Sequence, residues 1–325
     1  MRAILVEEGS EQLYLGEADF PRPKETELLV RVKATALNRA DLLQRKGRYP
    51  PPPGASAILG LEMAGVVEWV GQQVDGWQVG ERVCALLPGG GYAELVAIPA
   101  EMAMRIPENL SFEEAAAIPE VFLTAYLALF KLGDIKPGYK VLIHAGASGV
   151  GTAAIQLTRE AGASAIVTAS TAQKREACLK LGASLAIDYQ AGPFEAKIKA
   201  ATTGEGVNII LDPVGAPYWS QNLGCLATDG RLILIATMSG ARVAGLDLSQ
   251  ILRRRLQIIG TTLRARPVAE KIELTKQFAE FALPRFIDGR LAPVIDKIWP
   301  WEQASEAHDY MEQNRNVGKI ILRVA

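Results

Sequence analysis

Short apolar runs separated by glycine-rich turns fill the first third of the chain. Residues 28–34, 65–70 and 92–98 are rich in valine, leucine and isoleucine and have the length of strands. Glycines punctuate these runs, including a triplet at residues 89–91. The pattern predicts an antiparallel, barrel-like region that extends to about residue 110.

The pattern changes at Ser111, where helical spacing begins. Ser111 and Glu114 form the sequence of a capping box, in which the serine is the N-cap and the glutamate follows three residues later. Pro119 should interrupt this helix. A second apolar helix is expected from Glu120 to about Leu132.

Between residues 140 and 263, short apolar runs alternate with helical patterns. Continuous apolar runs that end in glycine or charged residues are typical of strands buried on both faces of a parallel sheet. A long helix is expected at about residues 268–283. The predicted fold class is therefore α/β, a doubly wound parallel sheet plus a β-barrel domain. The expected strands of the parallel sheet are 141–143, 165–168, 208–211, 231–235 and 257–260.

Composition and charge exclude several other classes of protein. The 325 residues are 49% hydrophobic and 22% charged, with a formal net charge of −1, which fits two globular domains and offers no basic surface for nucleic acid. No apolar stretch reaches the roughly 18 to 20 residues of a membrane-spanning helix, and the N-terminal apolar run is too short for a secretory signal. The three cysteines are scattered and predict no disulfide framework. We therefore expect a soluble, cytoplasmic protein.

The strongest local signal is a glycine-rich turn between a predicted strand and a predicted helix. Gly146, Gly149 and Gly151 permit a tight turn and let the backbone approach a pyrophosphate at the helix N-terminus. Ser148 stands where the usual pattern has its second glycine. An ordinary strand-to-helix turn is the alternative, but the strand–turn–helix order favours a dinucleotide site. The cofactor contacts expected here are Gly146, Ala147, Ser148, Gly149, Val150 and Gly151.

The end of the second predicted strand bears on the type of dinucleotide. An NAD site there uses a carboxylate to accept from the ribose 2′-hydroxyl, whereas this strand ends in Ser170 and Thr171. Hydroxyls followed by the cation Lys174 suit a 2′-phosphate, so we predict NADP(H), with Tyr189 at the end of the next strand as a further contact. The alternative is that Lys174 and Arg175 lie on a solvated helix face. The missing carboxylate favours the first interpretation.

A series of motifs resembles one enzyme family across essentially the whole chain. The resemblance is to the quinone oxidoreductase branch of the medium-chain dehydrogenase/reductase superfamily, which needs no zinc. It is strongest to the tumour-suppressor-inducible quinone oxidoreductase of animals and its bacterial relatives. The motifs that carry it lie at residues 36–41, 60–71, 80–83, 117–120, 144–151 and 316–320.

The resemblance implies both the domain organisation and an activity. It implies a GroES-like catalytic domain at residues 1–121 and 264–325 and a Rossmann NADP-binding domain at residues 122–263. The implied activity is NADPH-dependent reduction of a small hydrophobic quinone, and relatives are commonly homodimers. The resemblance also implies cofactor contacts from Asn38, Thr124, Met238, Ser239, Gly240, Thr262, Leu263 and Asn316.

The positions that bind zinc in zinc-dependent members of the superfamily differ in this sequence. Asn38 stands where those members have a cysteine ligand, and Leu61 where they have a histidine. The only histidines, His144 and His308, are far from any cysteine pair, so a tetrahedral nitrogen and sulfur site is hard to assemble. We expect no zinc, and we interpret His144 as a packed core histidine.

Without a metal, hydride transfer suits an acceptor already activated by conjugation, such as a quinone or an enone. Tyr49 lies on a loop that the family places at the active site. Its phenol is a candidate donor to the developing oxyanion, or a lid that packs on the substrate. Ser148 is a second catalytic candidate, or only a small residue in the turn. Glu62 is expected to be structural and paired with Arg39 or Arg82.

Two other functions stay open. NADPH-dependent reductases of enones or enoyl thioesters carry a tyrosine on the matching loop, so Tyr49 does not discriminate between these activities. A lens-crystallin relative in this branch binds RNA, which makes an NADPH-binding protein with incidental turnover the third interpretation. The balanced charge argues against nucleic acid as a partner. The expected partner is a small quinone or enone.

Overall fold

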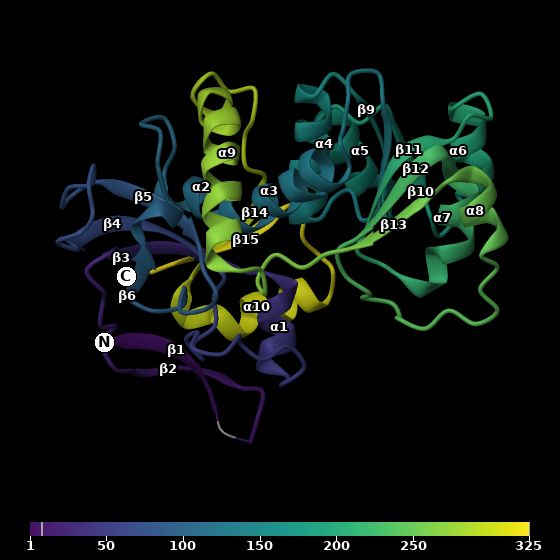
Figure 1. Cartoon of the computed structure of the whole chain (residues 1–325). Coiled ribbons are helices and arrows are strands. Elements are labelled where there is room, and N and C mark those ends of the chain that lie inside the picture. Colours follow the sequence, from purple (N-terminus) through teal and green to yellow (C-terminus); the bar gives the residue numbers. More distant parts are fainter. Residues whose placement is uncertain (8, 325) are drawn as a thin grey trace. The chain divides into compact units, whose positions relative to one another are not determined.

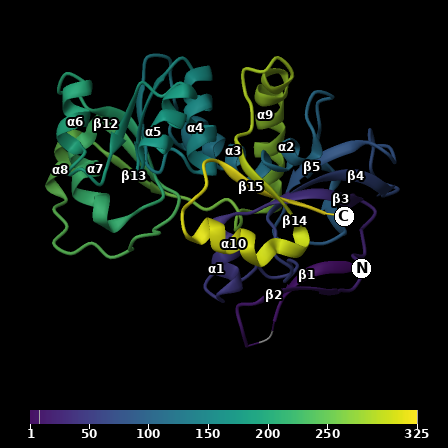
Figure 2. The same cartoon turned by 180° about the vertical axis from the view of Figure 1, so that it is seen from behind.

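The structure is a computed structural model that describes residues 1–7 and 9–324. It contains two compact units, Met1–Leu123 with Arg264–Ala325 and Thr124–Leu263. Figures 1 and 2 show the first unit in purple, blue and yellow-green to yellow, and the second in teal and green. Among the described residues, no helix combines the length and the apolarity that crossing a membrane requires.

The first unit is built on a seven-stranded, mainly antiparallel sheet. Its strands follow the order β14-β15-β3-β4-β5-β7, and β6 pairs with β3. Only β14 and β15 run parallel. The hairpin β1–β2 pairs separately. The strands are β1 (Arg2–Val6), β2 (Leu13–Glu17), β3 (Glu27–Ala36), β4 (Glu62–Val70), β5 (Arg82–Leu86), β6 (Leu95–Pro99), β7 (Ala103–Arg105), β14 (Ile295–Pro300) and β15 (Lys319–Arg323).

Strand β3 shows why this sheet has one apolar face. Leu28, Val30 and Val32 are buried at every second position, because alternate side chains of a strand point to the same face. Gly65 on β4 lies so close to β3 that a Cβ there would be 2.1 Å from the Arg31 carbonyl oxygen. The helices of this unit are α1 (Arg39–Arg45), η1 (Ala100–Met102), α2 (Phe112–Ala116), the start of α3 (Pro119–Tyr126), α9 (Val268–Ile287), η4 (Trp301–Gln303) and α10 (Ala304–Glu312).

The helix boundaries expected from the sequence are confirmed at two places. Ser111 is the N-cap of α2, where its Oγ accepts from the Glu114 amide at 3.2 Å and its own amide donates to the Glu114 carboxylate at 2.8 Å. Pro119 is the first residue of α3, a position that needs no amide hydrogen. The apolar helix then continues as the π-helical segment η2 (Leu127–Leu132).

The second unit is a six-stranded parallel sheet with helices on both faces. The strand order is β10-β9-β8-β11-β12-β13, which in chain order is 3-2-1-4-5-6, the order of the Rossmann fold. Figures 1 and 2 show α4 and α5 on one face and α6, α7 and α8 on the other. The elements are β8 (Lys140–Ile143), α4 (Gly149–Glu160), β9 (Ser164–Ala169), α5 (Ala172–Lys180), β10 (Leu185–Asp188), α6 (Glu195–Ala201), β11 (Val207–Asp212), η3 (Ala216–Tyr218), α7 (Trp219–Cys225), β12 (Leu226–Leu234), α8 (Ser249–Arg254) and β13 (Gln257–Gly260).

A buried polar chain joins the ends of β8, β9 and β11 to α7. His144 Nε2 lies 2.7 Å from Asn222 Oδ1, and His144 Nδ1 lies 3.0 Å from Thr168 Oγ1. The Asn222 amide nitrogen donates to Asp212 at 2.9 Å, so its oxygen accepts, and His144 carries its proton on Nε2. Burial lowers the pKa of His144 and keeps the ring neutral. His144 is therefore a packed core histidine, as the sequence indicates.

Candidate functional site

The glycine-rich turn of the second unit has no space for side chains at two of its glycines. A Cβ on Gly146 would lie 2.6 Å from the Val167 Cβ, and one on Gly151 would lie 2.4 Å from the Ala145 oxygen. Ser148 is the N-cap of α4, and its Oγ accepts from the Gly151 amide at 3.0 Å. The turn thus presents backbone at the N-terminus of a helix, the arrangement that suits a pyrophosphate.

The predicted cofactor residues of this unit lie along one edge of the parallel sheet. Because β8 to β13 run parallel, their carboxyl ends share that edge, where Rossmann folds bind dinucleotides. Thr124 differs, since it lies within α3 and follows no strand. The residues after the strands are Gly146–Gly151 after β8, Ser170, Thr171 and Lys174 after β9, Tyr189 after β10, Met238–Gly240 after β12, and Thr262 and Leu263 after β13.

The junction of β9 and α5 contains the residues expected to bind a 2′-phosphate. Thr171 is the N-cap of α5, and its Oγ1 accepts from the Lys174 amide at 3.2 Å. Arg175 donates to the Ser170 carbonyl at 3.0 Å and forms an ion pair with Asp188 at 2.8 Å. The Arg175 guanidinium is therefore bound within the unit. This pair is not evident in the sequence, because Asp188 ends a different strand.

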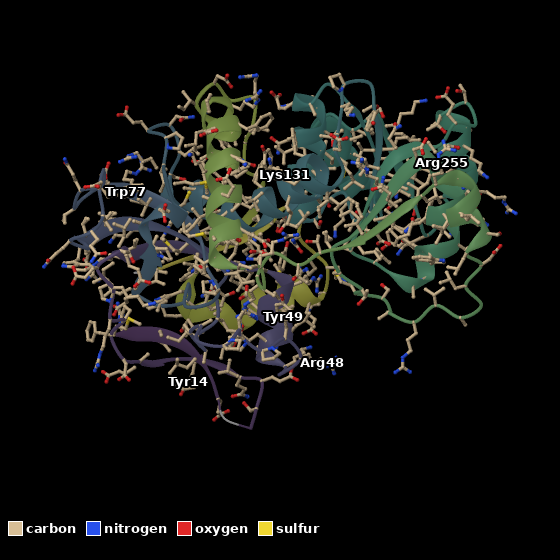
Figure 3. All side chains as sticks on the ribbon, in the orientation of Figure 1. Tyr14, Arg48, Tyr49, Trp77, Lys131 and Arg255 are labelled. Carbon is tan, nitrogen blue, oxygen red and sulfur yellow. The ribbon has the colours of Figure 1, made fainter. Side chains whose placement is uncertain are left out.

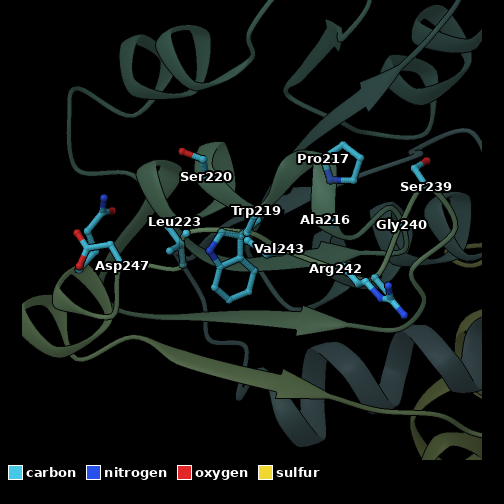
Figure 4. A pocket seen from close by; sticks show the side chains of 14 residues that line it. Ala216, Pro217, Trp219, Ser220, Leu223, Ser239, Gly240, Arg242, Val243 and Asp247 are labelled. Atoms are coloured by element: carbon cyan, nitrogen blue, oxygen red, sulfur yellow. The ribbon is translucent and has the colours of Figure 1, made fainter.

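An open pocket of about 920 Å³ lies in the second unit next to part of this edge. Figure 4 shows Trp219 of α7 and Arg242 of the loop after β12 among its lining residues. Ser239 and Gly240, which are predicted cofactor contacts, also line the pocket. No residue of the glycine-rich turn contributes to its wall, so the pocket is separate from the predicted pyrophosphate cradle.

The first unit contains a buried ion pair between Lys319 on β15 and Glu62 on β4. Lys319 Nζ lies 2.7 Å from Glu62 Oε1 and also donates to Asn38 Oδ1 at 2.8 Å and to the Leu37 carbonyl at 2.7 Å. The Asn38 amide nitrogen donates to Glu62 Oε1 at 2.8 Å. Both polar atoms of the Asn38 side chain thus have partners within this unit. Asn316, the other predicted cofactor contact here, donates to the Gly318 carbonyl at 2.7 Å.

The pairing of Glu62 with Arg39 or Arg82 that the sequence analysis expected is wrong. Arg39 binds the Asn314 side chain, and Arg82 donates to a backbone carbonyl. Glu62 meets Lys319 instead, because β15 pairs with β3, the neighbour of β4. In the sequence Lys319 is only a charged residue at the start of an apolar run.

Tyr49, labelled in Figure 3, follows α1. Its ring packs against a charged side chain. The Arg264 guanidinium lies 5.2 Å from the centre of the Tyr49 ring and donates to Gln44 Oε1 at 2.7 Å and to the Pro88 carbonyl at 2.8 Å. Burial raises the pKa of Tyr49, and the nearby charge of Glu120 raises it further. The phenol therefore stays protonated at neutral pH and can donate a hydrogen bond.

Two carboxyl groups near Glu62 have raised pKa values that no sequence pattern indicates. Burial raises the pKa of Asp41 to about 6, although Asp41 accepts from the amides of Asn38 at 2.8 Å and Gly60 at 2.9 Å. Burial and then repulsion from Glu62 raise the pKa of Glu120 to about 8. Both shifts depend on neighbours that are remote in the sequence.

Comparison with known proteins identifies the family. The family profile described as alcohol dehydrogenase GroES-like domain matches residues 24–108, and the profile described as zinc-binding dehydrogenase matches residues 149–280. Quinone oxidoreductase 1 of Escherichia coli is 35% identical over 321 residues, with 97% of this chain and 96% of that protein covered. The human synaptic vesicle membrane protein VAT-1 homolog is 32% identical, with 93% and 80% covered. The chain belongs to the medium-chain dehydrogenase/reductase superfamily.

Solved structures of the superfamily resemble this member over nearly their whole length. An NAD-dependent alcohol dehydrogenase has a TM-score of 0.89 at 31% identity, with both chains fully covered. The CurK enoyl reductase has a TM-score of 0.87 at 30% identity, with 100% and 99% covered. A mycobacterial protein complexed with NADPH has a TM-score of 0.88 at 29% identity, with 99% and 100% covered. The predicted family and the predicted α/β fold with a GroES-like domain are confirmed, and the protein is an oxidoreductase.

The residues at the superfamily's zinc positions do not fit a zinc ion. Leu61 is apolar and buried, and Asn38 is bonded to Glu62 and Lys319. A divalent cation beside Glu62 would also meet the ammonium of Lys319. Within residues 1–7 and 9–324, no three histidine, cysteine, aspartate or glutamate side chains are grouped so that they could hold a metal.

Lys319→Met should strongly destabilise the first unit, because it leaves the Glu62 carboxylate buried without its cation. We expect the free energy of unfolding in urea to fall by about 3–5 kcal/mol. The double variant Glu62→Gln/Lys319→Met removes both charges and should recover a large part of this loss. Equal losses in the single and the double variant would contradict a stabilising role for the pair.

Proposed function

We propose that this oxidoreductase is an NADPH:quinone oxidoreductase that transfers a hydride to a small hydrophobic quinone without a metal ion. The observation that carries the proposal is the Lys319 ammonium, which neutralises Glu62 next to the position of a zinc ligand in other members. The Lys319 ammonium already binds three protein acceptors, so it is not free to bind a substrate oxygen as a zinc ion with an open coordination position would. The reaction then favours acceptors that need only a hydrogen-bond donor.

The glycine-rich turn and the edge of the parallel sheet fit a dinucleotide. Backbone atoms fill the space that a side chain at Gly151 would need, and the turn lies at the N-terminus of α4, a position that favours a pyrophosphate. Ser170, Thr171, Lys174 and Tyr189 would hold the 2′-phosphate, and the likeness to the NADPH-bound mycobacterial protein supports this choice. When bound, the reduced nicotinamide supplies a hydride.

Tyr49 is the proposed donor to the substrate oxygen. Reduction of a quinone or an enone places negative charge on that oxygen, and a protonated phenol stabilises the charge by donating a hydrogen bond. Arg264, which lies against the ring of Tyr49, adds a positive charge on the same side of the unit. Packing of the same ring on the substrate is compatible with this role.

Reduction of an enone or an enoyl thioester is the second candidate function. The likeness to the CurK enoyl reductase favours it, and Tyr49 can serve both reactions. The homodimer and the cytoplasmic location expected from the sequence stay predictions. Binding of RNA rests on the resemblance to a lens-crystallin relative alone, and we do not propose it.

Turnover of a panel of acceptors tests the proposed function. With NADPH consumption as the readout, para-benzoquinone should give a higher kcat/KM than cyclohexenone or crotonyl coenzyme A, because a quinone accepts a hydride more readily and needs only a hydrogen-bond donor at its oxygen. Dialysis against a chelator should leave the rate unchanged. Turnover of the thioester alone would favour the second candidate, and a chelator-sensitive enzyme with stoichiometric zinc would contradict metal independence.

Lys174→Ala should raise the KM for NADPH by about 10- to 100-fold, the worth of one hydrogen bond to a charged group. The reaction with NADH should be nearly unaffected, since NADH lacks the 2′-phosphate. Lys180→Ala, at the other end of α5, is the matched control and should change neither value. A wild-type enzyme that prefers NADH would refute the assignment before any variant is made.

Tyr49→Phe keeps the ring and removes the donor. If donation matters, kcat with the quinone should fall by roughly one to three orders of magnitude, with little change in the KM for NADPH. Tyr49→Ala, which also removes the ring, is the comparison. An unchanged kcat in Tyr49→Phe beside a damaged Tyr49→Ala would leave only the role of a lid.

A further inference from the structure

Glu120, the second residue of α3, has a carboxyl oxygen in an unusual environment. Its backbone amide donates to Glu62 Oε2 at 2.8 Å, which fixes the start of α3 next to the buried ion pair. Its own Oε2 is closed to solvent and has no hydrogen-bond partner in the part of the chain that the structure describes. A buried oxygen without a partner is unfavourable, and most unfavourable when it is charged.

The cations around Glu120 have other partners at bonding distance. Lys319 binds Glu62, Asn38 and the Leu37 carbonyl. Arg264 binds Gln44 and two backbone carbonyls, and Lys271 on α9 donates to the Arg264 carbonyl at 3.2 Å. Lys319 and Arg264 therefore stabilise the ionised form of Glu120 only by electrostatic attraction over a longer distance.

Burial and repulsion from neighbouring carboxylates outweigh the attraction of these cations, so the pKa of Glu120 is raised. Burial is the largest cause of the raised pKa of Glu120, repulsion from Glu62 is the next, and Asp41 adds to it, while Lys319 and Arg264 oppose it. The N-terminus of α3 also favours the carboxylate, but its effect is small beside burial. With a pKa of about 8, most Glu120 side chains carry a proton at pH 7.

We propose that Glu120 is the proton donor of the reaction, and that its carboxyl passes a proton to the substrate oxygen while Tyr49 orients that oxygen. This inference rests on the proposed reductase function. A general acid works best when its pKa lies near the working pH. Tyr49 is a far weaker acid, because its pKa lies above its usual value of 10, and ionisation of Glu120 raises it further. The phenol therefore donates a hydrogen bond and keeps its proton.

The proposed step balances in atoms and charge. The quinone receives two electrons and one hydrogen as the hydride of the reduced nicotinamide, which leaves a negative oxygen. The O–H bond of Glu120 breaks, and a new O–H bond forms on that oxygen. Glu120 remains as a carboxylate and takes a proton from water before the next turnover. In total one NADPH, one quinone and one proton give NADP⁺ and a hydroquinone.

Glu120→Gln tests this role, because glutamine keeps the shape of the side chain and has no proton to give. We expect kcat with para-benzoquinone at pH 7 to fall about 100-fold, a typical contribution of general acid catalysis, with little change in the KM for NADPH. Wild-type kcat/KM for the quinone should fall above about pH 8, as Glu120 loses its proton. The variant should lack this decrease. Glu108→Gln, an exposed position in the same unit, is the matched control and should behave as wild type.

Thermal stability provides a readout that needs no turnover. The pKa of Glu120 rises from its ordinary value of 4.5 to about 8 in the folded protein, so the folded state holds the proton more tightly. The stability that this proton contributes is present below pH 4.5 and is lost as the pH rises to about 8. Glu120→Gln avoids this loss. Its Tm relative to wild type should therefore increase between about pH 5 and pH 8 and stay constant above.

The possible failures can be told apart. A wild-type enzyme that turns over no quinone and no enone would refute the proposed function, and the donor role with it. Full quinone turnover in Glu120→Gln with an unchanged pH profile would refute the donor role alone. A Tm difference that does not change with pH would show that Glu120 is ionised at neutral pH, and would also overturn the inference. If Glu120→Gln does not fold, a wild-type kcat/KM that stays constant through pH 8 gives the same negative answer.

Discussion

The buried ion pair between Lys319 and Glu62 fixes several segments of the first unit and sets the balance of charge around them. An ion pair removed from water is stable only when its hydrogen bonds are satisfied. Here the ammonium has three acceptors, namely Glu62, Asn38 and the Leu37 carbonyl. Glu62 in turn accepts from Asn38 and from the Glu120 amide. The pair thereby fixes β4, β15 and the starts of α1 and α3 relative to one another, although these segments come from both ends of the chain.

The same pair sets the balance of charge around it. One ammonium neutralises one carboxylate, yet Asp41 and Glu120 also lie within electrostatic reach of Glu62. Asp41 accepts two backbone amides, which stabilise its ionised form. Glu120 has no such partner on Oε2 within the described residues, so it is the group that holds a proton near neutral pH. An enzyme that reduces a substrate with hydride needs a proton source, and this imbalance creates one from ordinary side chains.

The sequence predicted the second unit better than the first for a physical reason. Strands buried on both faces are continuous apolar runs, and a glycine-rich turn lies within a few residues of the strand and helix that it joins. Both signals are local, and β8, β9, β11 and β13 formed within one residue of where they were expected, whereas β12 begins at Leu226, before the expected run 231–235. The ion pair of the first unit depends instead on the pairing of β15 with β3. Glu62 was therefore assigned the wrong partner, and Glu120 was noticed only as part of a motif.

The proposed choice of NADPH depends on a few side chains at the junction of β9 and α5. Arg175 follows Lys174 in α5, but it is bound to Asp188 and to the Ser170 carbonyl. In the function that we propose, selectivity for NADPH depends on the hydroxyls of Ser170 and Thr171 and on Lys174, which lie at the N-terminus of α5. Related structures of nearly the same fold include an NAD-dependent alcohol dehydrogenase and a protein complexed with NADPH. Such a difference is understandable if the fold supplies the pyrophosphate cradle and a few side chains after one strand select the phosphate.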